Sequence, residues 1–279
     1  MEETKTNAYT QSEMMAAIAA RELRDGEVVF VGIGLPNLAC NLARATHAPN
    51  LLLIYESGAV GAVPDRLPVS IGDPALVTGS LMVVSMADIF QCFLQNGKIQ
   101  VGFLGGAQID RWGNINTTVV GAYGKPKVRL PGAGGASAIA ISAQRTLIIS
   151  KLSKRNFPEK VDFVTSPGMR YPGPGPSVQA TSAPYHEVFG KTGSRRSELG
   201  MTGAGPVRVI TDKCVLELDE NVGEMTVSAL YPGVRLEEVK AEVGWDLKAR
   251  RELPLVEPPT ARELTLLREK LDPKKLYLK

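Results

Sequence analysis

The tripeptide Glu56-Ser57-Gly58 places a carboxylate just after the apolar run of residues 51–54, with Tyr55 between them. Such a run predicts a short buried strand, and α/β sheets bind their ligands at the carboxyl ends of strands. The glycine lets the chain turn tightly and bring its backbone close to a bound molecule. A carboxylate at this place either attacks an acyl carbon as a nucleophile or is a solvated charge at a strand end. We expect the former, with Glu56 attacking a thioester.

Three glycine-dense turns, at residues 32–36, 105–107 and 132–136, each follow a predicted strand or open a predicted helix. In a parallel sheet, such turns lie at the same edge as Glu56. Gly134-Gly135-Ala136 opens a helix and therefore offers free backbone N–H groups, which can bind a phosphate or stabilise an oxyanion. The alternative is that the glycines only allow the helix to pack closely against the sheet.

Two side-chain amides, Gln108 and Asn116, follow the second of these turns. They either add hydrogen-bond donors to the same site or bond within their own loop, as such residues often do. Asp110 and Arg111, which lie between them, are expected to stabilise the turn. Small residues of the turns are expected to line the substrate: Gly34, Ser57, Gly58, Gly105 and Gly106.

A different motif, residues 29–34, is similar to the beginning of a dinucleotide-binding fingerprint, in which Glu56 would hold a ribose. The third glycine of that fingerprint would stand at position 37, but the residue there is Asn37, and Pro36 lies inside the turn. We therefore set nicotinamide and flavin binding aside. The sequence has neither a G-x-S-x-G motif nor a convincing Ser-His-Asp spacing, so a covalent mechanism depends on a carboxylate.

The composition narrows the class of protein further. The 279 residues have a net charge of +3 and no basic stripe with interleaved aromatics, which argues against nucleic acid. Three widely spaced cysteines form neither a disulfide framework nor a zinc pattern, and with two histidines no metal site is expected. The N-terminus is polar, and no apolar run approaches the roughly 20 residues that span a membrane. These features predict a cytoplasmic protein without a membrane anchor.

One small basic cluster, Lys151, Lys154 and Arg155, stands out from the scattered charges. It either faces solvent at the end of a strand or holds an anionic nucleotide tail.

Alternating strand and helix patterns predict an α/β fold with a mostly parallel central sheet flanked by helices. Two capping boxes, Thr10–Glu13 and Thr260–Glu263, each open a helix, and the second helix is expected over residues 260–272. Further helices are expected at residues 36–45, 85–95 and 136–143, and strands at residues 27–33, 51–55, 98–104, 145–150, 207–211, 215–218 and 225–229.

We expect residues 1–279 to form a single domain. Residues 59–80, rich in Gly and Pro, predict a long ordered loop, and loops of this length are usually functional. Residues 167–205 contain a run of alternating Pro and Gly that excludes a helix or a central strand. This loop-rich peripheral segment is a lid, a partner surface or an ordinary surface loop.

In combination, these motifs resemble those of class I coenzyme A transferases. Glu56-Ser57-Gly58 is similar to the E-x-G motif of that family, residues 32–36 to its G-x-G-x-P turn, and residues 132–136 to its G-x-G-G-A loop. The resemblance covers the chain from about residue 12 to about residue 245 and is strongest to the β subunit of glutaconate CoA-transferase-like enzymes. Other segments that match the family are residues 105–110 with 113–116, 161–168 and 231–234.

That resemblance implies an open α/β fold and transfer of CoA between an acyl-CoA and a carboxylic acid, with CoA as substrate and carrier and no permanently bound cofactor. It implies that Glu56 forms an acyl-glutamyl anhydride and then a glutamyl-CoA thioester. The backbone of residues 134–136, with Gln108 or Asn116, would stabilise the oxyanions. It also implies a homologous α subunit, in an αβ heterodimer or a higher heteromer, that completes the cleft.

Other members on the same scaffold have different chemistry. Some hydrolyse the ring of a cyclic CoA thioester, others decarboxylate a glutaconyl-type CoA, and these have replaced the E-x-G glutamate. The chain retains Glu56, which favours transfer over the two alternatives. A non-catalytic subunit that binds acyl-CoA is a further alternative.

Overall fold

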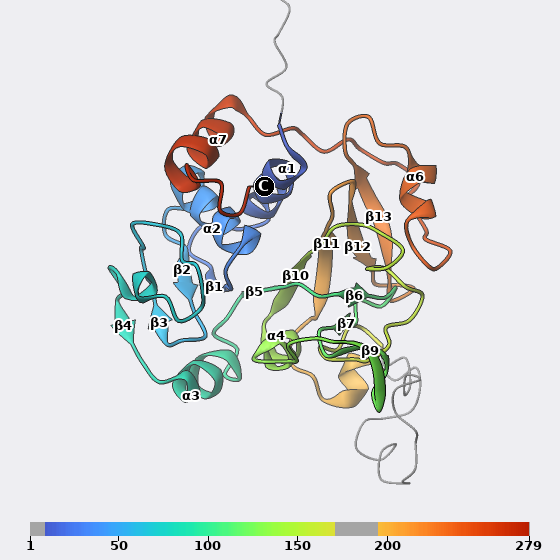
Figure 1. Ribbon diagram of the computed structural model, residues 1–279, viewed down its shortest axis with the longest axis horizontal. Coiled ribbons are helices and arrows are strands. Elements are labelled where there is room, and N and C mark those ends of the chain that lie inside the picture. The colour runs from blue at the N-terminus through green and yellow to red at the C-terminus, as the bar shows by residue number, and fades with distance from the viewer. Residues whose placement is uncertain (1–8, 171–194, 279) are drawn as a thin grey trace, which may run out of the picture.

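The computed structural model describes residues 9–170 and 195–278, and a nine-stranded sheet forms its centre (Figure 1). Five central strands run parallel in the order β11-β10-β5-β1-β2. The predicted α/β class with a parallel sheet core is therefore confirmed. The bounds of these strands are β1 (Val28–Phe30), β2 (Leu52–Ile54), β5 (Val101–Leu104), β10 (Arg145–Ile149) and β11 (Pro206–Ile210).

Two antiparallel strands extend the parallel core at each edge. On one side, β12 (Cys214–Asp219) and β13 (Glu224–Leu230) follow β11. On the other side, β3 (Ala59–Val60) and β4 (Met82–Val83) follow β2. The apolar patterns predict β12 and β13, whereas β3 and β4 have two residues each and carry no pattern that could predict them.

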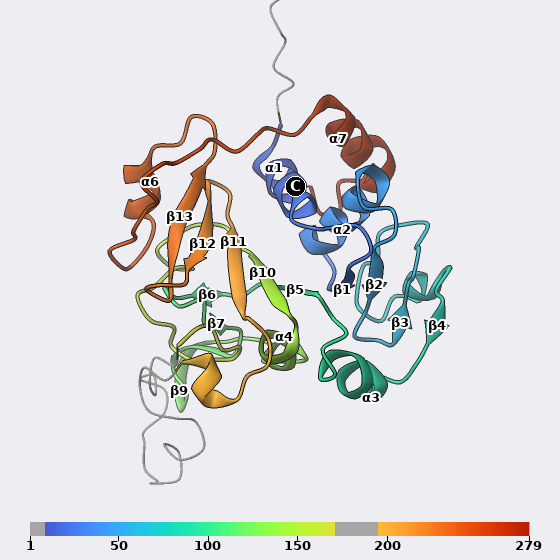
Figure 2. The ribbon, with the colours of Figure 1, turned by 180° about the vertical axis from the view of Figure 1, so that it is seen from behind.

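Helices bury both faces of the sheet. Successive strand residues point to opposite faces, so each face has its own apolar core. Val29, Leu53 and Leu147 belong to one apolar core. This core also includes side chains of α1 (Gln11–Arg21), α2 (Leu35–Thr46) and the π-helix η4 (Leu266–Leu271), which continues α7 (Ala261–Thr265). Figure 2 shows α1, α2 and α7 grouped together beside the strands β1 and β2.

The opposite face of the sheet carries a second apolar core. Phe30, Ile54 and Ile148 belong to it. Since side chains alternate along a strand, Glu56 follows Ile54 toward this second face. Three helical segments contribute to this core. One is the π-helix η2 (Ile89–Leu94), which continues α3 (Met86–Asp88); the others are α4 (Ala136–Ser142) and α6 (Leu236–Ala241).

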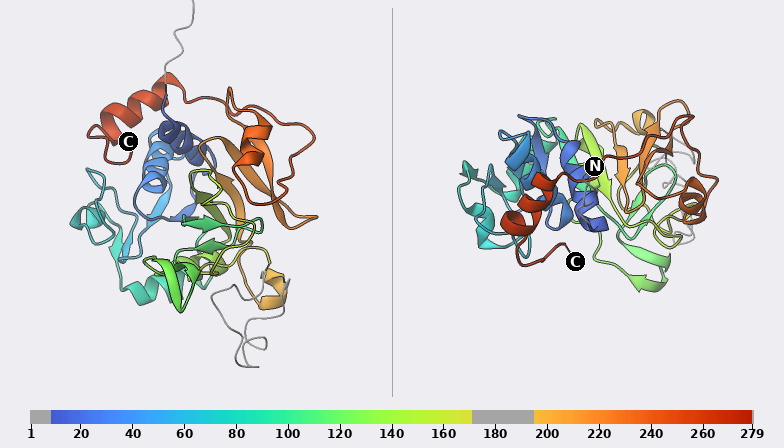
Figure 3. Two further views of the ribbon diagram at one scale, coloured as in Figure 1. Left: turned by 45° about the vertical axis from the view of Figure 1, so that its right-hand side comes forward. Right: turned by 90° about the horizontal axis from the view of Figure 1, so that it is seen from above.

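Both predicted capping boxes, that of α1 and that of the C-terminal helix, are present. Each capping glutamate also binds an arginine of the other helix. Arg268 Nε lies 2.6 Å from Glu13 Oε1, and Arg21 Nη2 lies 2.7 Å from Glu263 Oε2. These two ion pairs fix the C-terminal helix against α1, and Figure 3 shows the two helices side by side.

Residues 59–80, predicted to be one long loop, begin with strand β3, which belongs to the main sheet, and one carboxylate organises the part that follows. Asp73 accepts hydrogen bonds from the backbone N–H groups of Val69 and Ala75, each at 2.9 Å. The same carboxylate pairs with both Nη atoms of Arg66 at 2.7 Å. Asp73 is thereby the N-cap of a 3₁₀-helix, η1 (Pro74–Val77).

Of the predicted loop-rich segment 167–205, residues 171–194 lie outside the described residues. Its two ends pack into the body of the protein through Arg196, which is buried in a 3₁₀-helix, η3 (Arg196–Leu199). The Arg196 guanidinium donates to the carbonyl oxygens of Ala140 and Ile141 in α4 at 2.6 and 3.3 Å. It also donates, at 3.1 Å each, to the carbonyl oxygens of Pro167, Gly168 and Gly203.

Four further short strands form two antiparallel ribbons beside the main sheet: β6 (Gln108–Ile109) with β7 (Ile115–Asn116), and β8 (Val119–Ala122) with β9 (Lys125–Arg129). Across residues 9–170 and 195–278, no helix is both long enough and apolar enough to cross a membrane.

Candidate active site

The carboxyl ends of three parallel strands meet at one edge of the sheet. Phe30, at the end of β1, is level with Ile54 in β2 and with Gly102 in β5. The turns that follow these strands, residues 31–36, 55–58 and 105–107, therefore lie at the same edge, as the sequence predicts.

Glu56 lies at this edge beside the glycine turn that opens α4. The Glu56 side chain is half-buried, and its Oε1 atom is 3.2 Å from the position that a Cβ on Gly135 would take and 3.9 Å from that of Gly134. Ala136 uses its N–H to bond the Ala133 carbonyl at 2.9 Å. The N–H groups of Gly134 and Gly135 donate to no acceptor in the part of the chain that the structure describes, so they remain available to a ligand.

Two close contacts hold α4 and its glycine turn in place. A Cβ on Gly102 of β5 would lie 2.4 Å from Ile139 Cγ2, so α4 packs directly on the strand. A Cβ on Gly135 would lie 2.4 Å from Phe90 Cζ, and the Phe90 ring packs against Phe30 with centroids 5.6 Å apart. Gly135 therefore serves close packing and also lies beside the carboxylate.

Phe90 is a residue of the site that the motifs do not predict. It lies in η2, within the helix predicted at residues 85–95. An aromatic residue in the middle of a predicted helix does not indicate which distant residue its ring covers, so the contact with Gly135 cannot be predicted from the sequence.

Tyr55, the residue before Glu56, is held in place by a hydrogen bond from Asn37. Tyr55 is fully buried, and its hydroxyl accepts a hydrogen bond of 2.7 Å from Asn37 Nδ2. Burial raises the pKa of Tyr55 well above its ordinary value, so the phenol stays protonated. Asn37 occupies the position where a dinucleotide fingerprint requires glycine, and its amide instead joins α2 to the end of β2. The sequence predicts no positioning role for Asn37, because its pattern only excludes the fingerprint.

The other small residues predicted to line the substrate lie at the same edge of the sheet. Ser57 and Gly105 are exposed, and Gly34 is half-buried at the start of α2. Gly58 has a φ of +108°, and a Cβ there would lie 2.0 Å from the Val84 carbonyl oxygen. Gly106 is equally tight, because a Cβ would lie 2.2 Å from Ile115 Cγ2. Gly58 and Gly106 are thus required by packing, whatever else they contact.

The two predicted side-chain amides face each other across the β6–β7 ribbon. Asn116 Nδ2 donates to Gln108 Oε1 at 2.7 Å and to the Val119 carbonyl at 2.6 Å. Gln108 Nε2 donates to Asp162 Oδ2 at 3.0 Å. Both amide hydrogens of Asn116 are thus used inside the protein, and the structure favours the alternative in which these amides bond within their own region.

Asp110 stabilises the β6–β7 turn, as predicted. Its Oδ1 accepts hydrogen bonds from the backbone N–H groups of Trp112 and Asn114 at 3.1 and 3.0 Å. Burial raises the pKa of Asp110 to about 7, against the lowering effect of these hydrogen bonds.

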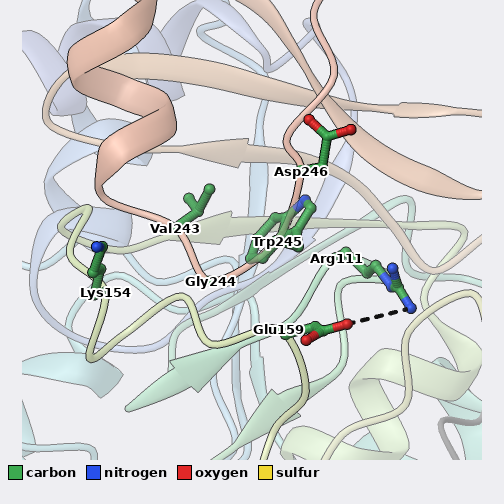
Figure 4. Close-up of a pocket in the computed structure, with 7 residues that line it drawn as sticks. All are labelled: Arg111, Lys154, Glu159, Val243, Gly244, Trp245 and Asp246. Carbon is green, nitrogen blue, oxygen red and sulfur yellow. Dashed lines mark ion pairs between the residues drawn. The ribbon is translucent and has the colours of Figure 1, made fainter.

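A separate cavity of about 570 Å³ lies between Arg111 and the segment that follows α6 (Figure 4). Lys154 of the basic cluster reaches it, but acidic and basic side chains are balanced there, and Arg111 lies 4.0 Å from Glu159. Neither Glu56 nor the 132–136 turn belongs to its lining: Arg111, Lys154, Glu159, Val243, Gly244, Trp245 and Asp246. The cavity is therefore separate from the residues around Glu56.

Within the described residues, no group of three or more His, Cys, Asp or Glu side chains could hold a metal ion. The features that remain at the carboxyl edge are one carboxylate, a turn with two available N–H groups and several small residues. This set suits attack on a carbonyl compound, with charge stabilised by backbone donors.

Comparison with known proteins gives the family. The family model for coenzyme A transferase matches residues 12–242. One of the subunits of 3-oxoadipate CoA-transferase from Pseudomonas knackmussii is 48% identical, over 94% of this chain and 93% of its own length. The chain therefore belongs to the coenzyme A transferase family, which confirms the resemblance seen in its motifs.

Two other relatives add detail. The corresponding subunit of glutaconate CoA-transferase from Acidaminococcus fermentans is 35% identical over 97% of this chain and 95% of its own. The crystal structure of that enzyme matches with a TM-score of 0.83 and 33% identity, over 98% of each chain. Caffeate CoA-transferase from Acetobacterium woodii is 28% identical over 82% of this chain, which corresponds to 40% of that longer protein.

Proposed function

We propose that this chain is the β subunit of a heteromeric CoA-transferase and that Glu56 is its nucleophile. The observation that carries the proposal is the position of Glu56 Oε1 beside Gly134 and Gly135, whose N–H groups bond no other described residue. For covalent acyl transfer, the nucleophilic carboxylate and the backbone donors that bind the oxyanion must reach the same carbonyl group.

The proposed reaction has four attacks. The Glu56 carboxylate attacks the acyl-CoA carbonyl, the C–S bond breaks, and CoA thiolate leaves an acyl-glutamyl anhydride. The thiolate attacks the glutamyl carbonyl of the anhydride, which releases the first acid and forms a glutamyl-CoA thioester. A second carboxylate then attacks the carbonyl of this thioester, the C–S bond breaks, and a second acyl-glutamyl anhydride forms as the thiolate leaves. The thiolate attacks the new acyl carbonyl of this anhydride, which forms the new acyl-CoA and releases the Glu56 carboxylate.

Each attack passes through a tetrahedral oxyanion, which the N–H groups of Gly134 and Gly135 would stabilise. One such preorganised donor typically contributes about 2.7–4 kcal/mol to the transition state. Carboxylates are weak nucleophiles, so binding energy from the CoA portion must be used to hold the thioester against Glu56. Partial burial of Glu56 supports this by limiting its contact with water.

The names of the relatives guide the choice of partner and substrates. We propose a companion α subunit, and we propose 3-oxoadipate as the first acceptor acid to assay because the 48% identity is to a 3-oxoadipate enzyme. Glutaconate is the second acid to assay, and succinyl-CoA and acetyl-CoA serve as donors.

The test is mass spectrometry of the peptide that contains Glu56, after the two subunits are mixed with acyl-CoA and no acceptor. The expected mass increase equals CoA minus water. Glu56→Ala should abolish both the adduct and CoA transfer, whereas Glu252→Ala, at an exposed position, should leave both intact. Normal turnover by the Glu56→Ala enzyme would contradict the proposal and favour a hydrolase or decarboxylase on the same scaffold.

A further inference from the structure

Exposed apolar side chains are concentrated in one short segment. The described residues include thirteen exposed large apolar side chains, and seven of them lie between residues 63 and 86. Leu81 is the most exposed, with 74% of its surface accessible, and Val83 follows closely in the chain with 60%. Single apolar residues on a surface are ordinary, but a contiguous group marks a contact surface.

Four of these residues, Val63, Leu81, Met82 and Val83, lie on a two-stranded ribbon formed by residues 58–63 and 78–84, which we call the apolar ribbon. Strands β3 and β4 form its centre. At the end nearest the site, the Val84 N–H donates to the Gly58 carbonyl at 3.0 Å. The ribbon is thus held by its own backbone. Ala59, Val60 and Ala62 in its first half are buried, whereas the exposed side chains of its second half are Leu81, Met82 and Val83.

The β4 strand is bare on both of its faces. Met82 and Val83 point to opposite faces of the sheet, yet they are 47% and 60% exposed. β4 is also the last strand of the sheet, and β3 is its only partner among the described strands. Residues 81–84 include neither a charged residue nor proline, the features that commonly prevent association of edge strands. Such an edge requires a covering partner.

The apolar ribbon is continuous with the candidate active site. It begins two residues after Glu56, and Gly58 is pressed against Val84. Beyond Val84 the chain enters α3 and η2, where Phe90 covers Gly135. A body that covers the ribbon therefore also borders the exposed part of Glu56.

We propose that the apolar ribbon is the surface on which the companion α subunit docks. The inference rests on the proposed function, because that function supplies the partner. In the caffeate enzyme, the match to this chain accounts for 40% of one polypeptide, so the remainder of that polypeptide can fill the same role. A second copy of this chain is the competing occupant, but β4 has two residues, and self-pairing of two such edges would form few hydrogen bonds.

The test measures binding of this full chain to the companion α subunit, by light scattering after size exclusion and by titration calorimetry. Leu81→Glu and Val83→Glu each place a carboxylate at the centre of the ribbon. Each should raise the Kd at least tenfold. Because both side chains are exposed, the melting temperature of the isolated chain should stay within a few degrees of wild type.

Leu255→Glu is the matched control. Leu255 is 61% exposed and bridges to Leu230 of β13, at the opposite edge of the sheet. Its Kd should stay within twofold of wild type. Wild-type affinity of the ribbon variants, or an equal loss in the control, would overturn the proposal. So would ribbon variants that break a self-dimer yet bind the α subunit normally, since the occupant would then be a second copy.

Glu56→Ala separates this inference from the proposed function. It should bind the α subunit with wild-type Kd while transfer is lost. If Glu56→Ala binds normally and also turns over normally, the nucleophile assignment fails while the docking surface stands. If wild-type chain and α subunit do not associate at all, the docking surface fails.

Discussion

Glu56 Oε1 lies 3.2 Å from the point where a Cβ on Gly135 would stand. Glu56 follows β2, whereas Gly135 opens the helix that leads into β10, and two strands, β1 and β5, separate β2 from β10 in the sheet. The contact joins segments that η2 and α4 bring together on one face of the sheet, where Phe90 of η2 packs on Gly135. Figure 1 shows α3 and α4 as neighbours at this end of the sheet.

Gly135→Ala should lower both the stability of the protein and its rate of catalysis. The new methyl group would meet Phe90 Cζ at 2.4 Å and Glu56 Oε1 at 3.2 Å, so the ring and the turn must shift. A displacement near 1 Å costs about 100-fold in rate, and overpacking costs about 1–3 kcal/mol of stability. We expect losses of this order in kcat of the assembled enzyme and in the free energy of unfolding.

Gly124→Ala is the control for this change, because a Cβ there meets nothing within 4 Å. Combining Gly135→Ala with Phe90→Leu should recover part of the lost stability. A Gly135→Ala enzyme with wild-type kcat would show that the turn need not approach Glu56 so closely.

Tyr55→Phe should weaken the support behind Glu56. The change removes the acceptor of the 2.7 Å hydrogen bond from Asn37 Nδ2 in a fully buried place. A buried donor without a partner costs about 1–3 kcal/mol, measurable by urea denaturation. Tyr123→Phe, at a side chain that is 47% exposed, should change stability by less than about 0.5 kcal/mol. Equal effects of the two changes would refute a special role for the Asn37 contact.

Arg196→Met should remove the hydrogen bonds that hold the C-terminal part of α4 in place. Burial lowers the pKa of Arg196 to about 10, which still leaves the guanidinium charged at neutral pH. The substitution deprives several buried carbonyl groups of their donor, at a cost of about 3 kcal/mol. Because α4 carries the glycine turn, kcat should fall while KM for the acid changes less. Arg195→Met, one position away and exposed, should leave both unchanged, and a similar loss there would count against this view.

Acid should release the loop that carries the apolar ribbon. The hydrogen bond from Arg66, followed by those from Val69 and Ala75, lowers the pKa of Asp73 far below its ordinary value. A lowered carboxyl pKa stabilises the folded loop above the unfolded-state pKa, near 4, and this stabilisation is lost as the pH falls further. Asp73→Asn should therefore increase protease cleavage in residues 59–80 at pH 7. The difference from wild type should shrink below pH of about 4, and a constant difference would contradict the assignment.

The sequence predicts best those features whose information is local. The apolar run 145–150 predicts β10, observed as Arg145–Ile149, and the two capping boxes begin helices where expected. β3 and β4 could not be predicted, because two residues carry no periodicity and β2 supplies their alignment.

The candidate site shows the same limit. Glu56 and the 132–136 turn could be placed at one edge from strand order alone. Whether Gln108 faced the substrate depended on Asp162, a partner distant in sequence, and the cover of Phe90 over Gly135 depended on how two helices pack. Such contacts arise from tertiary packing, for which a single sequence gives no pattern.

The reciprocal pairing of Glu13 with Arg268 and of Glu263 with Arg21 couples two helices from opposite ends of the sequence. Each glutamate caps the first turn of its own helix and also forms an ion pair with the neighbouring helix. Unwinding of one first turn therefore also breaks an ion pair that holds the other helix. The first turns of α1 and α7 should consequently exchange their amide hydrogens through one shared opening event, at a single rate set by the pair.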